Sequence, residues 1–528
     1  MHKHLFYGAV SLVCLWTTLW LPSPPALAAD AGSIQGRVLD PLGAAVPNAK
    51  VVLLRQQKAV SQTRTNSQGH FVFASCLPGR YHVHVEAKGF SPQNSRSVFL
   101  SARGRVTVSV MLPVGLLRQQ VVVLDTGTKL PESQVGASVS VIDHQELDAL
   151  NKLDVADALR LLPGVQVVQT GERGSTTSVF VRGGNADFNK VLFDGIPAND
   201  IGGAFEFANA ATSGVDSVEV LRGPNSVVYG SDALSSVISL TTPRGTTPAP
   251  EITYSTDGGN FNTLRQEASL SGLFRHFDYY SDFMRFDTQN SLPNNSFHNA
   301  TYSGNFGWEP NGTTTVRFTI HHDATGLSDS NALYLYGIPD DSFQRQQDTY
   351  LGITAQNQTT PRWHNMVHLT STGINFHFDN PSPTGAPFNP FGFGANYLGD
   401  PVTICGANGF CTHGQAILDF GGTYPQLFDS RTSIQSVYAQ SDYAFSHDVG
   451  ATAGFEYDHE YGFAQASGAL RSPSTRNNYN SFLEIHAALW QRAFATAGVG
   501  LEDNAIFGFA VTPRVSGAYY LKQPSSTH

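Results

Sequence analysis

Three short apolar runs, each containing glycine, stand near the middle of the chain: FVRGG at residues 180–184, VLFDGIP at 191–197 and VEVLRGP at 218–224. Valine, isoleucine and phenylalanine favour strands, and the glycines allow tight turns and a close approach of the backbone to its neighbours. The three runs therefore predict short strands in a compact unit that packs closely inside its surroundings.

Two short helices are expected before these runs. Asp143 is expected to cap the first, and the second is expected to start at Asp154, with Asp157 three residues later in an arrangement like a capping box. The second helix has one apolar face and stops at Pro163-Gly164. The region is thus expected to be a mixed α/β unit that ends in a linker at residues 241–250. Its strands are predicted at residues 139–142, 165–168, 178–181, 190–193 and 218–221.

Further blocks at residues 158–165, 228–233 and 237–238 keep a fixed order with the three runs. In this order and spacing the region resembles the plug domain of TonB-dependent outer-membrane receptors. It departs from that family at Ser235-Ser236, where a glycine pair is usual, and at Ser239, where asparagine is usual. The resemblance implies a TonB box and plug domain over residues 116–245, in a transporter that works by energy-coupled rearrangement of the plug.

The same resemblance implies a scarce, bulky nutrient as substrate: a metal–siderophore complex, cobalamin or a complex glycan. The plug most resembles the cobalamin-type branch of the family. The implied partners are TonB with its inner-membrane energising complex, outer-membrane lipid, and a small-molecule or glycan ligand. Two alternatives stay open, a surface binding or signalling receptor that does not transport and a non-functional truncated receptor.

The TonB box is expected just before the plug, where an extended segment can add a strand to the partner's sheet. The same segment can instead form the last strand of the preceding domain or the first strand of the plug. The residues of the predicted box are Gln120, Val121, Val122, Val123 and Leu124.

Plug–barrel contacts are expected from Arg182, Glu219 and Arg222, because these charges stand in β-rich surroundings and match positions that face the barrel wall in the family. The alternative is that they face solvent. Ligand contacts are expected from the outward turns that follow the first and second runs. Turn chemistry alone explains Asn, Asp and Gly there, whereas aromatic residues, which include Phe207, suit an apolar or planar ligand. The predicted ligand-binding residues are Asn185, Asp187, Phe188, Asn199, Asp200 and Phe205.

The N-terminus has the pattern of a secretory signal peptide over residues 1–28, with a charged start, an apolar run at 5–21 and Ala26-Leu27-Ala28 as the cleavage site. A membrane anchor is the alternative, but the run is short and ends in prolines. Export with cleavage places the mature chain outside the cytoplasm. The resemblance to TonB-dependent receptors then implies the outer membrane of a Gram-negative bacterium for the barrel and the periplasm for the domain before the plug.

Residues 29–115 alternate apolar and polar residues with turns between them, as a small β-sandwich does. His82 and His84 alternate with tyrosine and valines in one strand, and are expected on its solvent face rather than as zinc ligands. The segment resembles the carboxypeptidase regulatory-like domain, which is not catalytic. The matching residues are Gly36, Asp40, Gly69, Phe71, Pro78-Gly79 and Ala87-Lys88-Gly89-Phe90.

Residues 246–528 predict a transmembrane antiparallel β-barrel. Charged residues make up 14% of the chain, against about 25% in typical soluble proteins. After residue 250, apolar residues such as Val316 and Phe318 alternate with polar ones such as Arg317 and Thr319. A barrel strand needs this alternation between lipid and a wet interior, although any half-buried antiparallel sheet gives it too.

The fold class expected for the whole chain is mostly β, with a signal peptide, a small sandwich, an α/β plug and an incomplete barrel. The barrel segment supplies about 11–13 strands, roughly half of the 22 in plugged transporters. We therefore expect a truncated or split version of a longer receptor.

Cys405 and Cys411 enclose a short glycine-containing loop, and a disulfide is favoured over a metal pair because further ligands at zinc spacing are missing. Cys76 is expected to be a buried small hydrophobe. Oxygen ligands suit calcium, but such clusters are common in acidic loops; the candidates are Asp340, Asp341 and Asp348. We otherwise expect no metal, no cofactor and no catalytic residues. The net charge of −10 argues against nucleic acid as a partner.

Overall fold

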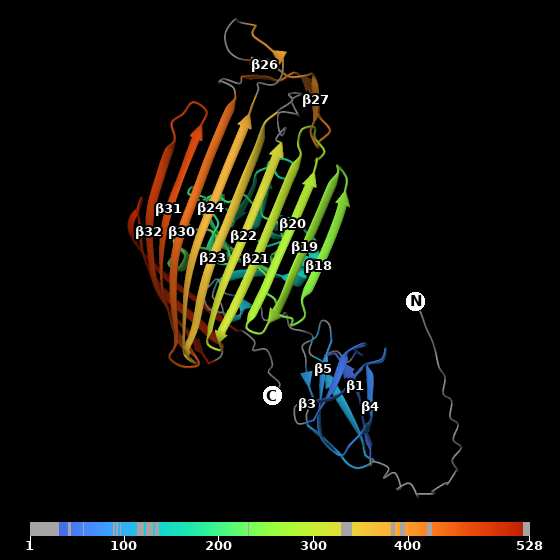
Figure 1. Cartoon of the computed structure of the whole chain (residues 1–528). Helices are drawn as coiled ribbons and strands as arrows, with labels where there is room; N and C mark the ends of the chain where they lie inside the picture. The colour runs from blue at the N-terminus through green and yellow to red at the C-terminus, as the bar shows by residue number, and fades with distance from the viewer. Residues whose placement is uncertain are drawn as a thin grey trace, which may run out of the picture. The chain divides into compact units, whose positions relative to one another are not determined.

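The computed structural model describes a set of ranges that belong to two compact units, Met1–Gln119 and Gln120–His528. Figure 1 shows their elements coloured along the chain. The predicted signal peptide lies outside the described ranges. Every helix within them is too short or too polar to traverse a lipid bilayer. The ranges are residues 31–40, 44–55, 58–87, 90, 93–95, 97–112, 121–122, 130–131, 137–230, 232–328, 341–381, 386–390, 396–419, 425–490 and 492–520.

The first unit is the predicted β-sandwich. One of its sheets has the order β4-β1-β8, and the other has the order β3-β2-β5-β6 with β7 also paired to β5. Alternate side chains fill one apolar core; in β5, Tyr81, Val83 and Val85 are buried and His82 is exposed, as predicted. The strands are β1 (Gly32–Leu39), β2 (Lys50–Arg55), β3 (Lys58–Arg64), β4 (His70–Cys76), β5 (Gly79–Glu86), β6 (Gln93–Asn94), β7 (Val98–Leu100) and β8 (Arg105–Met111).

The connection after the sandwich contains one short antiparallel pair. Strand β9 (Val121–Val122) pairs with β10 (Leu130–Pro131). Two residues of the predicted TonB box therefore lie in β9. The other three, Gln120, Val123 and Leu124, lie outside the described residues.

Residues 137–245 are called the plug, after the resemblance of their sequence. Their main sheet has the order β11-β16-β17-β14-β15, in which β14 and β17 run parallel and the other pairs antiparallel. A separate hairpin joins β12 and β13. The predicted α/β unit is confirmed. Its elements are β11 (Ser138–Asp143), α1 (His144–Leu150), α2 (Val155–Leu159), β12 (Val165–Gln169), β13 (Thr177–Val181), η2 (Ala186–Phe188), β14 (Asn189–Phe193), β15 (Ile196–Pro197), β16 (Ser217–Arg222), α3 (Ser226–Tyr229) and β17 (Ser236–Thr241).

The first two plug helices begin in different ways. Asp143 caps α1 as predicted, because its carboxylate accepts a hydrogen bond from Glu146 N at 3.0 Å. The capping box predicted for α2 is wrong. Asp154 makes no hydrogen bond that caps the helix, since its carboxylate pairs with Arg173 instead.

Residues 251–519 form a 12-stranded antiparallel sheet, which we call the wall. Each strand pairs with the next along the chain, and β18 and β34 are the edges. The strand number agrees with the predicted 11–13, and Figure 1 shows the sheet curving around the plug. The strands are β18 (Glu251–Gly259), β19 (Thr263–Phe274), β20 (Phe277–Thr288), β21 (Phe297–Asn311), β22 (Thr314–Ser328), β23 (Phe343–Thr360), β24 (Trp363–Asn380), β30 (Gln426–Ala444), β31 (Val449–Ala466), β32 (Ser472–Leu489), β33 (Ala493–Asn504) and β34 (Gly508–Tyr519).

The predicted alternation of wall residues is confirmed. In β22, Arg317, Thr319 and His321 are buried, whereas Phe318 points away from the plug and is 39% exposed. The polar side chains of the strand therefore face the plug, and the apolar side chains form the outer surface of the wall.

The two ends of the wall differ in the length of their connections. Short turns such as residues 275–276 and 312–313 lie at one end, and longer connections, up to residues 381–425, lie at the other, which we call the loop end. The longest connection carries a disulfide between Cys405 and Cys411, which joins β27 to β28. Its strands are β25 (Ala386–Pro387), β26 (Asn396–Leu398), β27 (Val402–Cys405), β28 (Cys411–Gly414) and β29 (Ile417–Asp419).

Candidate functional site: the plug and the surrounding wall

Three carboxylates line one face of wall strand β31, and we call them the acidic strip. Glu456, Asp458 and Glu460 are spaced two residues apart, so their side chains point to the same side of the sheet, which is the side of the plug. Lys190 of plug strand β14 is only 7% exposed. Its Nζ donates to the carbonyl oxygen of Tyr229 at 2.9 Å and lies 4.0 Å from Glu456 Oε1.

The ammonium of Lys190 stays charged in this setting. Burial by itself lowers the pKa of a lysine, but the carboxylates of Glu456 and Asp458 outweigh burial and raise the pKa above its usual value. The plug therefore presents a lasting positive charge to the acidic strip.

A small cavity lies beside this charge pair. Its volume of about 20 Å³ is enough for a water molecule. Burial raises the pKa of Asp200, one of its lining residues, although hydrogen bonds from Ala204 N and Gly202 N oppose the rise. The lining residues are Lys190, Pro197, Asn199, Asp200, Asp232, Ile434, Asp458 and Glu460.

A second cation, Arg476 of β32, lies at the end of the acidic strip. Its Nε donates to Glu460 Oε2 at 2.6 Å, and its Nη2 donates to the carbonyl oxygen of Ile201 at 2.7 Å. The N–H of Ile201 donates to Thr432 Oγ1 at 3.2 Å. The wall thus holds both backbone polar groups of Ile201, which lies within a predicted ligand-binding turn.

The turn between β12 and β13 of the plug binds the wall connection at residues 289–296, which lies at the loop end. The carboxylate of Glu172 accepts hydrogen bonds from Ser291 N at 2.9 Å, Leu292 N at 3.1 Å and Asn295 Nδ2 at 3.1 Å, and also from the Ser291 hydroxyl. Burial opposes ionisation of Glu172, but these hydrogen bonds outweigh it and lower the pKa. One plug carboxylate therefore fixes the course of the wall connection at residues 289–296.

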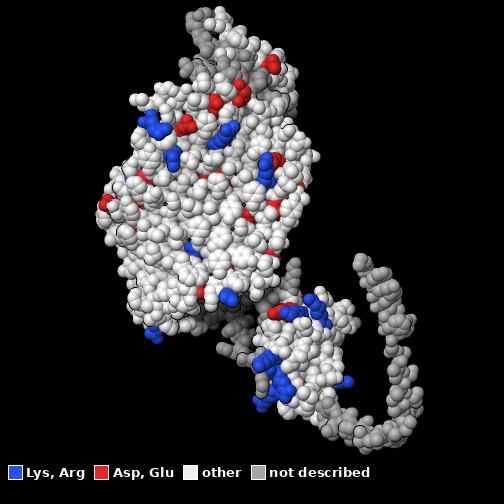
Figure 2. Space-filling view, viewed as in Figure 1, with Lys and Arg blue, Asp and Glu red and all other residues white. Residues whose placement is uncertain are grey.

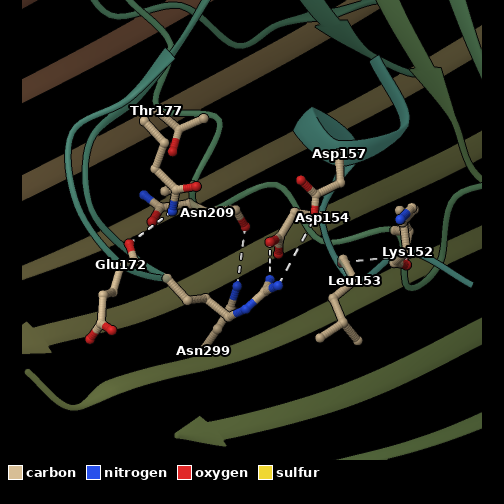
Figure 3. Close-up of polar contacts among 12 residues, drawn as sticks. Lys152, Leu153, Asp154, Asp157, Glu172, Thr177, Asn209 and Asn299 are labelled. Carbon is tan, nitrogen blue, oxygen red and sulfur yellow. Dashed lines mark hydrogen bonds and ion pairs between the residues drawn. The ribbon is translucent and has the colours of Figure 1, made fainter. Parts of the chain in front are cut away.

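Arg173 ties the base of the same turn to the second helix. Asp154 and Asp157 point toward its guanidinium from α2 and the residue before it (Figure 3). Asn290 of the wall donates to the Arg173 carbonyl oxygen at 2.9 Å. Burial raises the pKa of Asp154 to about 6, and Arg173 opposes the rise. The two plug acids are thus paired within the plug.

Many other wall side chains bind backbone carbonyl groups of the plug. Figure 3 shows Asn299 of β21 reaching toward Asn209, whose carbonyl oxygen accepts its hydrogen bond at 3.2 Å. Such contacts follow the path of the plug chain rather than its side chains, and water can replace them singly. The same kind of bond joins Asn305 to Thr242, Thr372 to Pro197 and Asn480 to Val228.

One plug side chain contacts the wall mainly through its ring. Phe193 stacks on His321 of β22, with ring centroids 4.2 Å apart, and on Tyr350 of β23, at 5.0 Å. The next residue, Asp194, accepts hydrogen bonds from Thr242 N and Oγ1, each at 2.9 Å. The VLFDGIP run is therefore anchored to the wall by stacking on one side and to the end of the plug on the other.

The two predicted ligand-binding turns lie against each other. Gly203 has a φ of +89°, and a Cβ built there would lie 3.0 Å from the carbonyl oxygen of Asp187. Asn185 is exposed and Phe188 is 38% exposed. The structure therefore brings the two turns together, with an accessible aromatic ring on the first.

Three of the predicted ligand residues shape the second turn. Asn199 is 5% exposed, and its amide bonds Val191 N, the carbonyl oxygen of Asn189 and that of Gly203. Asp200 Oδ1 accepts hydrogen bonds from Gly202 N and Ala204 N. Phe205 packs edge-on against Phe207, with centroids 4.7 Å apart. Phe207 itself is 2% exposed, so the expectation of an exposed ring there is wrong, because the ring fills the plug core.

The predicted plug–barrel residues have different surroundings. Arg222 is 7% exposed and donates to Ser138 Oγ at 3.1 Å and Ser140 Oγ at 2.5 Å, both on plug strand β11. Glu219 is buried in the middle of β16. Arg182 is exposed and has a φ of +52°. A role for these three at the wall stays a prediction.

The acidic residues considered for calcium are not neighbours in one loop. Asp348 lies in β23, is 3% exposed and accepts hydrogen bonds from Gln346 Nε2 at 2.9 and 3.1 Å. Asp341 precedes that strand, and Asp340 lies outside the described residues. The prediction that Asp348 lies in a loop is wrong, because Asp348 is part of β23 and its side chain faces the interior.

Lys190, Glu172 and the acidic strip are not among the site residues predicted from the sequence. The strip has a readable signal, since Glu456, Asp458 and Glu460 occupy every second position of the sequence, as side chains on one face of a strand do. Glu172 has none, because its partners lie 119 to 123 residues away in the chain.

The comparisons with known proteins agree with this geometry. Residues 131–237 match the TonB-dependent receptor plug domain, and residues 33–113 match the carboxypeptidase regulatory-like domain. The chain is 32% identical over 232 residues to the vitamin B12 transporter BtuB of Vibrio vulnificus, which covers 40% of this chain and 38% of the transporter. The chain thus spans well under half the length of that curated relative.

Solved structures share the fold at low sequence identity. Pseudomonas aeruginosa FpvA bound to heterologous pyoverdines superposes with a TM-score of 0.58 at 16% identity, over 76% of this chain and 57% of FpvA. The ferric yersiniabactin uptake receptor FyuA of Yersinia pestis gives 0.53 at 14% identity, over 74% and 64%. The chain therefore carries the plug domain of TonB-dependent receptors, enclosed by a sheet with the fold of their β-barrels and preceded by a carboxypeptidase regulatory-like domain.

Proposed function

We propose that this protein imports a scarce, bulky nutrient across the outer membrane of a Gram-negative bacterium, with the plug displaced by energy from TonB. The observation that carries the proposal is the way the plug is held. Beside apolar contacts with Phe297, Tyr350 and Phe482, hydrogen bonds and charge pairs join the plug to the wall at many points, such as Lys190 with the acidic strip. Water can take over such contacts when the plug moves, whereas an apolar core would resist displacement.

The proposed substrate is a metal–siderophore complex, cobalamin or a complex glycan. The similar proteins are a vitamin B12 transporter, a receptor bound to pyoverdines and a ferric yersiniabactin uptake receptor. We propose that this chain binds its substrate on the turns at Asn185–Phe188 and Asn199–Phe205. These turns lie against each other near the loop end. The exposed ring of Phe188 suits a planar or apolar part of the ligand.

The proposed partner is TonB, acting with its inner-membrane energising complex on the segment Gln120–Leu124. In the structure Val121–Val122 pair with Leu130–Pro131. This pair is only two residues long, so separating it to form a strand with TonB costs few hydrogen bonds. The sandwich is then periplasmic.

The test uses deletion of residues 120–124 from the chromosomal gene of the producing organism, followed by separate measurement of ligand binding and uptake. Labelled cobalamin and iron-loaded siderophores serve as probes. We expect binding to whole cells to persist and uptake to disappear. Deletion of residues 113–117 shortens the same connection equally and is expected to leave uptake in place.

Two results would count against the proposal. If cells without residues 120–124 took up the ligand as before, this segment could not be the one through which TonB acts. Binding without uptake in the unmodified strain would favour the second reading, a surface receptor that binds or signals without transport.

A further inference from the structure

The sandwich has a charge opposite to the rest of the chain. Residues 31–112 contain ten Lys and Arg but only two Asp and Glu, which gives +8, whereas the whole chain has −10 and the remainder therefore −18. A local excess of this size, confined to one small unit, attracts an anionic partner irrespective of the net charge of the protein.

Part of this charge gathers at one end of the sandwich beside exposed apolar side chains. Arg55 and Lys58 are paired neighbours at the hairpin end of β2 and β3, and Arg80 is opposite Phe99 in the pairing of β5 with β7. Arg55 Nη2 donates to the carbonyl oxygen of Pro78 at 3.3 Å, next to Leu77. The basic–apolar patch consists of Arg55, Lys58, Leu77, Arg80 and Phe99.

The cations of this patch are not neutralised within the sandwich. Among the described residues, Lys58 and Arg80 have no ion pair, and the one bond of Arg55 goes to a carbonyl group. Glu86 pairs with Lys50 at the opposite end of β5, at 3.2 Å. On the face shown in Figure 2, Lys and Arg lie beside acidic side chains at one end of this unit, and a cluster of Lys and Arg without acidic neighbours lies toward the other end.

The apolar members of the patch are open to solvent. Leu77 is 53% exposed and Phe99 is 66% exposed. A row of cations beside accessible leucine and phenylalanine matches a lipid surface, where cations meet phosphate groups and apolar side chains enter the acyl boundary. A nucleic acid or acidic protein would satisfy the cations but would leave Leu77 without an apolar partner.

The patch also lies away from the exit of the chain toward the plug. Gly32 pairs with Cys76, just before Leu77, so the patch is at the end where β1 begins. The chain leaves the sandwich at the other end, where Met111 pairs with Leu39. The patch is thus at the end of the sandwich opposite Met111, the last residue of β8.

We propose that this basic–apolar patch docks the sandwich on an anionic phospholipid surface. The inference concerns a domain whose role the import proposal does not assign, and it stands or falls independently of import. Each cation near an anionic membrane strengthens binding roughly fivefold.

The experiment uses the full chain in phosphatidylcholine nanodiscs, mixed with sucrose-loaded vesicles and sedimented. Vesicles contain phosphatidylcholine alone or with phosphatidylglycerol. We expect co-sedimentation only with phosphatidylglycerol, at least tenfold weaker binding for the double variant Lys58→Glu/Arg80→Glu, and weaker binding for Leu77→Ser/Phe99→Ser at unchanged charge. Unchanged hydrogen exchange of the backbone amides in β1, β4 and β8 reports that the sandwich of each variant is folded.

The matched control is Arg37→Glu/Arg64→Glu, which changes the net charge equally at the opposite end of the sandwich. It is expected to bind like the unmodified protein. An equal loss of vesicle binding in both charge-reversed variants would show that the attraction is spread over the whole sandwich, and would overturn the proposal that the patch is the docking site. Equal binding to both vesicle types, or capture by DNA or polyglutamate that Leu77→Ser/Phe99→Ser does not weaken, would overturn the lipid assignment.

Discussion

The ammonium of Lys190 lies 4.0 Å from Glu456 Oε1, and this pair joins plug strand β14 to wall strand β31. The lysine is buried and faces Asp458 as well as Glu456, so its removal leaves these two carboxylates without their cation. The pair is therefore a point where a single side chain controls how firmly the plug is seated.

Lys190→Met is expected to loosen the plug locally. Removing one partner of a buried charge pair costs about 3 kcal/mol because the remaining charge stays desolvated. Hydrogen exchange of the backbone amides in β14 and of residues 228–230 should therefore speed up, while exchange in the sandwich stays the same. Lys152→Met, at an exposed plug lysine, is the control and should change neither. Identical exchange for both variants would mean that Lys190 does not seat the plug.

Glu172→Gln is expected to free the wall connection at residues 289–296. The charged carboxylate accepts bonds from Ser291 N and Leu292 N, and a bond to a charged group contributes roughly 1.5 kcal/mol or more. The free energy of opening measured by hydrogen exchange at these two amides should therefore fall by that amount at neutral pH. Glu146→Gln, at an exposed helix position, should leave them unchanged.

The same contact predicts a dependence on acid. The folded pKa of Glu172 is lowered, so the unfolded form binds the proton more readily and stability rises with pH. Protection of Ser291 and Leu292, corrected for intrinsic exchange, should be complete above the usual glutamate pKa and lost as pH falls through the lowered value. Protection that does not decrease in acid would contradict the role of the carboxylate.

Glu206 predicts a pH dependence of stability with the opposite sign. Burial raises its pKa to about 7, although the N–H groups of Thr177 and Ala208 oppose the rise. Between the usual value of 4.5 and about 7, the folded form holds the proton and the unfolded form does not, so plug stability falls as pH rises. Glu206→Gln should flatten this slope and stabilise the plug at pH 8 by up to about 3 kcal/mol. Plug unfolding followed at several pH values tests this, and an unchanged slope would assign the effect to another group.

Removal of the disulfide should act only on its own hairpin. Cys405 and Cys411 join β27 to β28 in a two-stranded sheet that is separate from the wall, and closing a loop this short contributes about 2 kcal/mol. In Cys405→Ser/Cys411→Ser, exchange at residues 402–414 should increase while β24 and β30 stay protected. Faster exchange in those two wall strands would show that the hairpin supports the wall.

Local chemistry explains which parts of the plug could be predicted. The strand at Ser217–Arg222 and the cap of α1 by Asp143 depend on neighbours within a few residues. The capping box at Asp154 failed because Arg173, which lies on a different turn, competes for the same carboxylate. Phe207 was expected in an exposed turn, and the fold instead places its ring in the core.

The sequence by itself determined the order of domains, the alternation of the wall strands and the glycine turns of the plug, because these follow from the period of a strand and from backbone freedom at single residues. Only the tertiary structure decided that Lys190 meets the acidic strip, that Glu172 holds residues 289–296, and that Arg55, Lys58 and Arg80 share one end of the sandwich. Charge and burial act through distance in space, and the folding of the chain brings together groups that no local pattern connects.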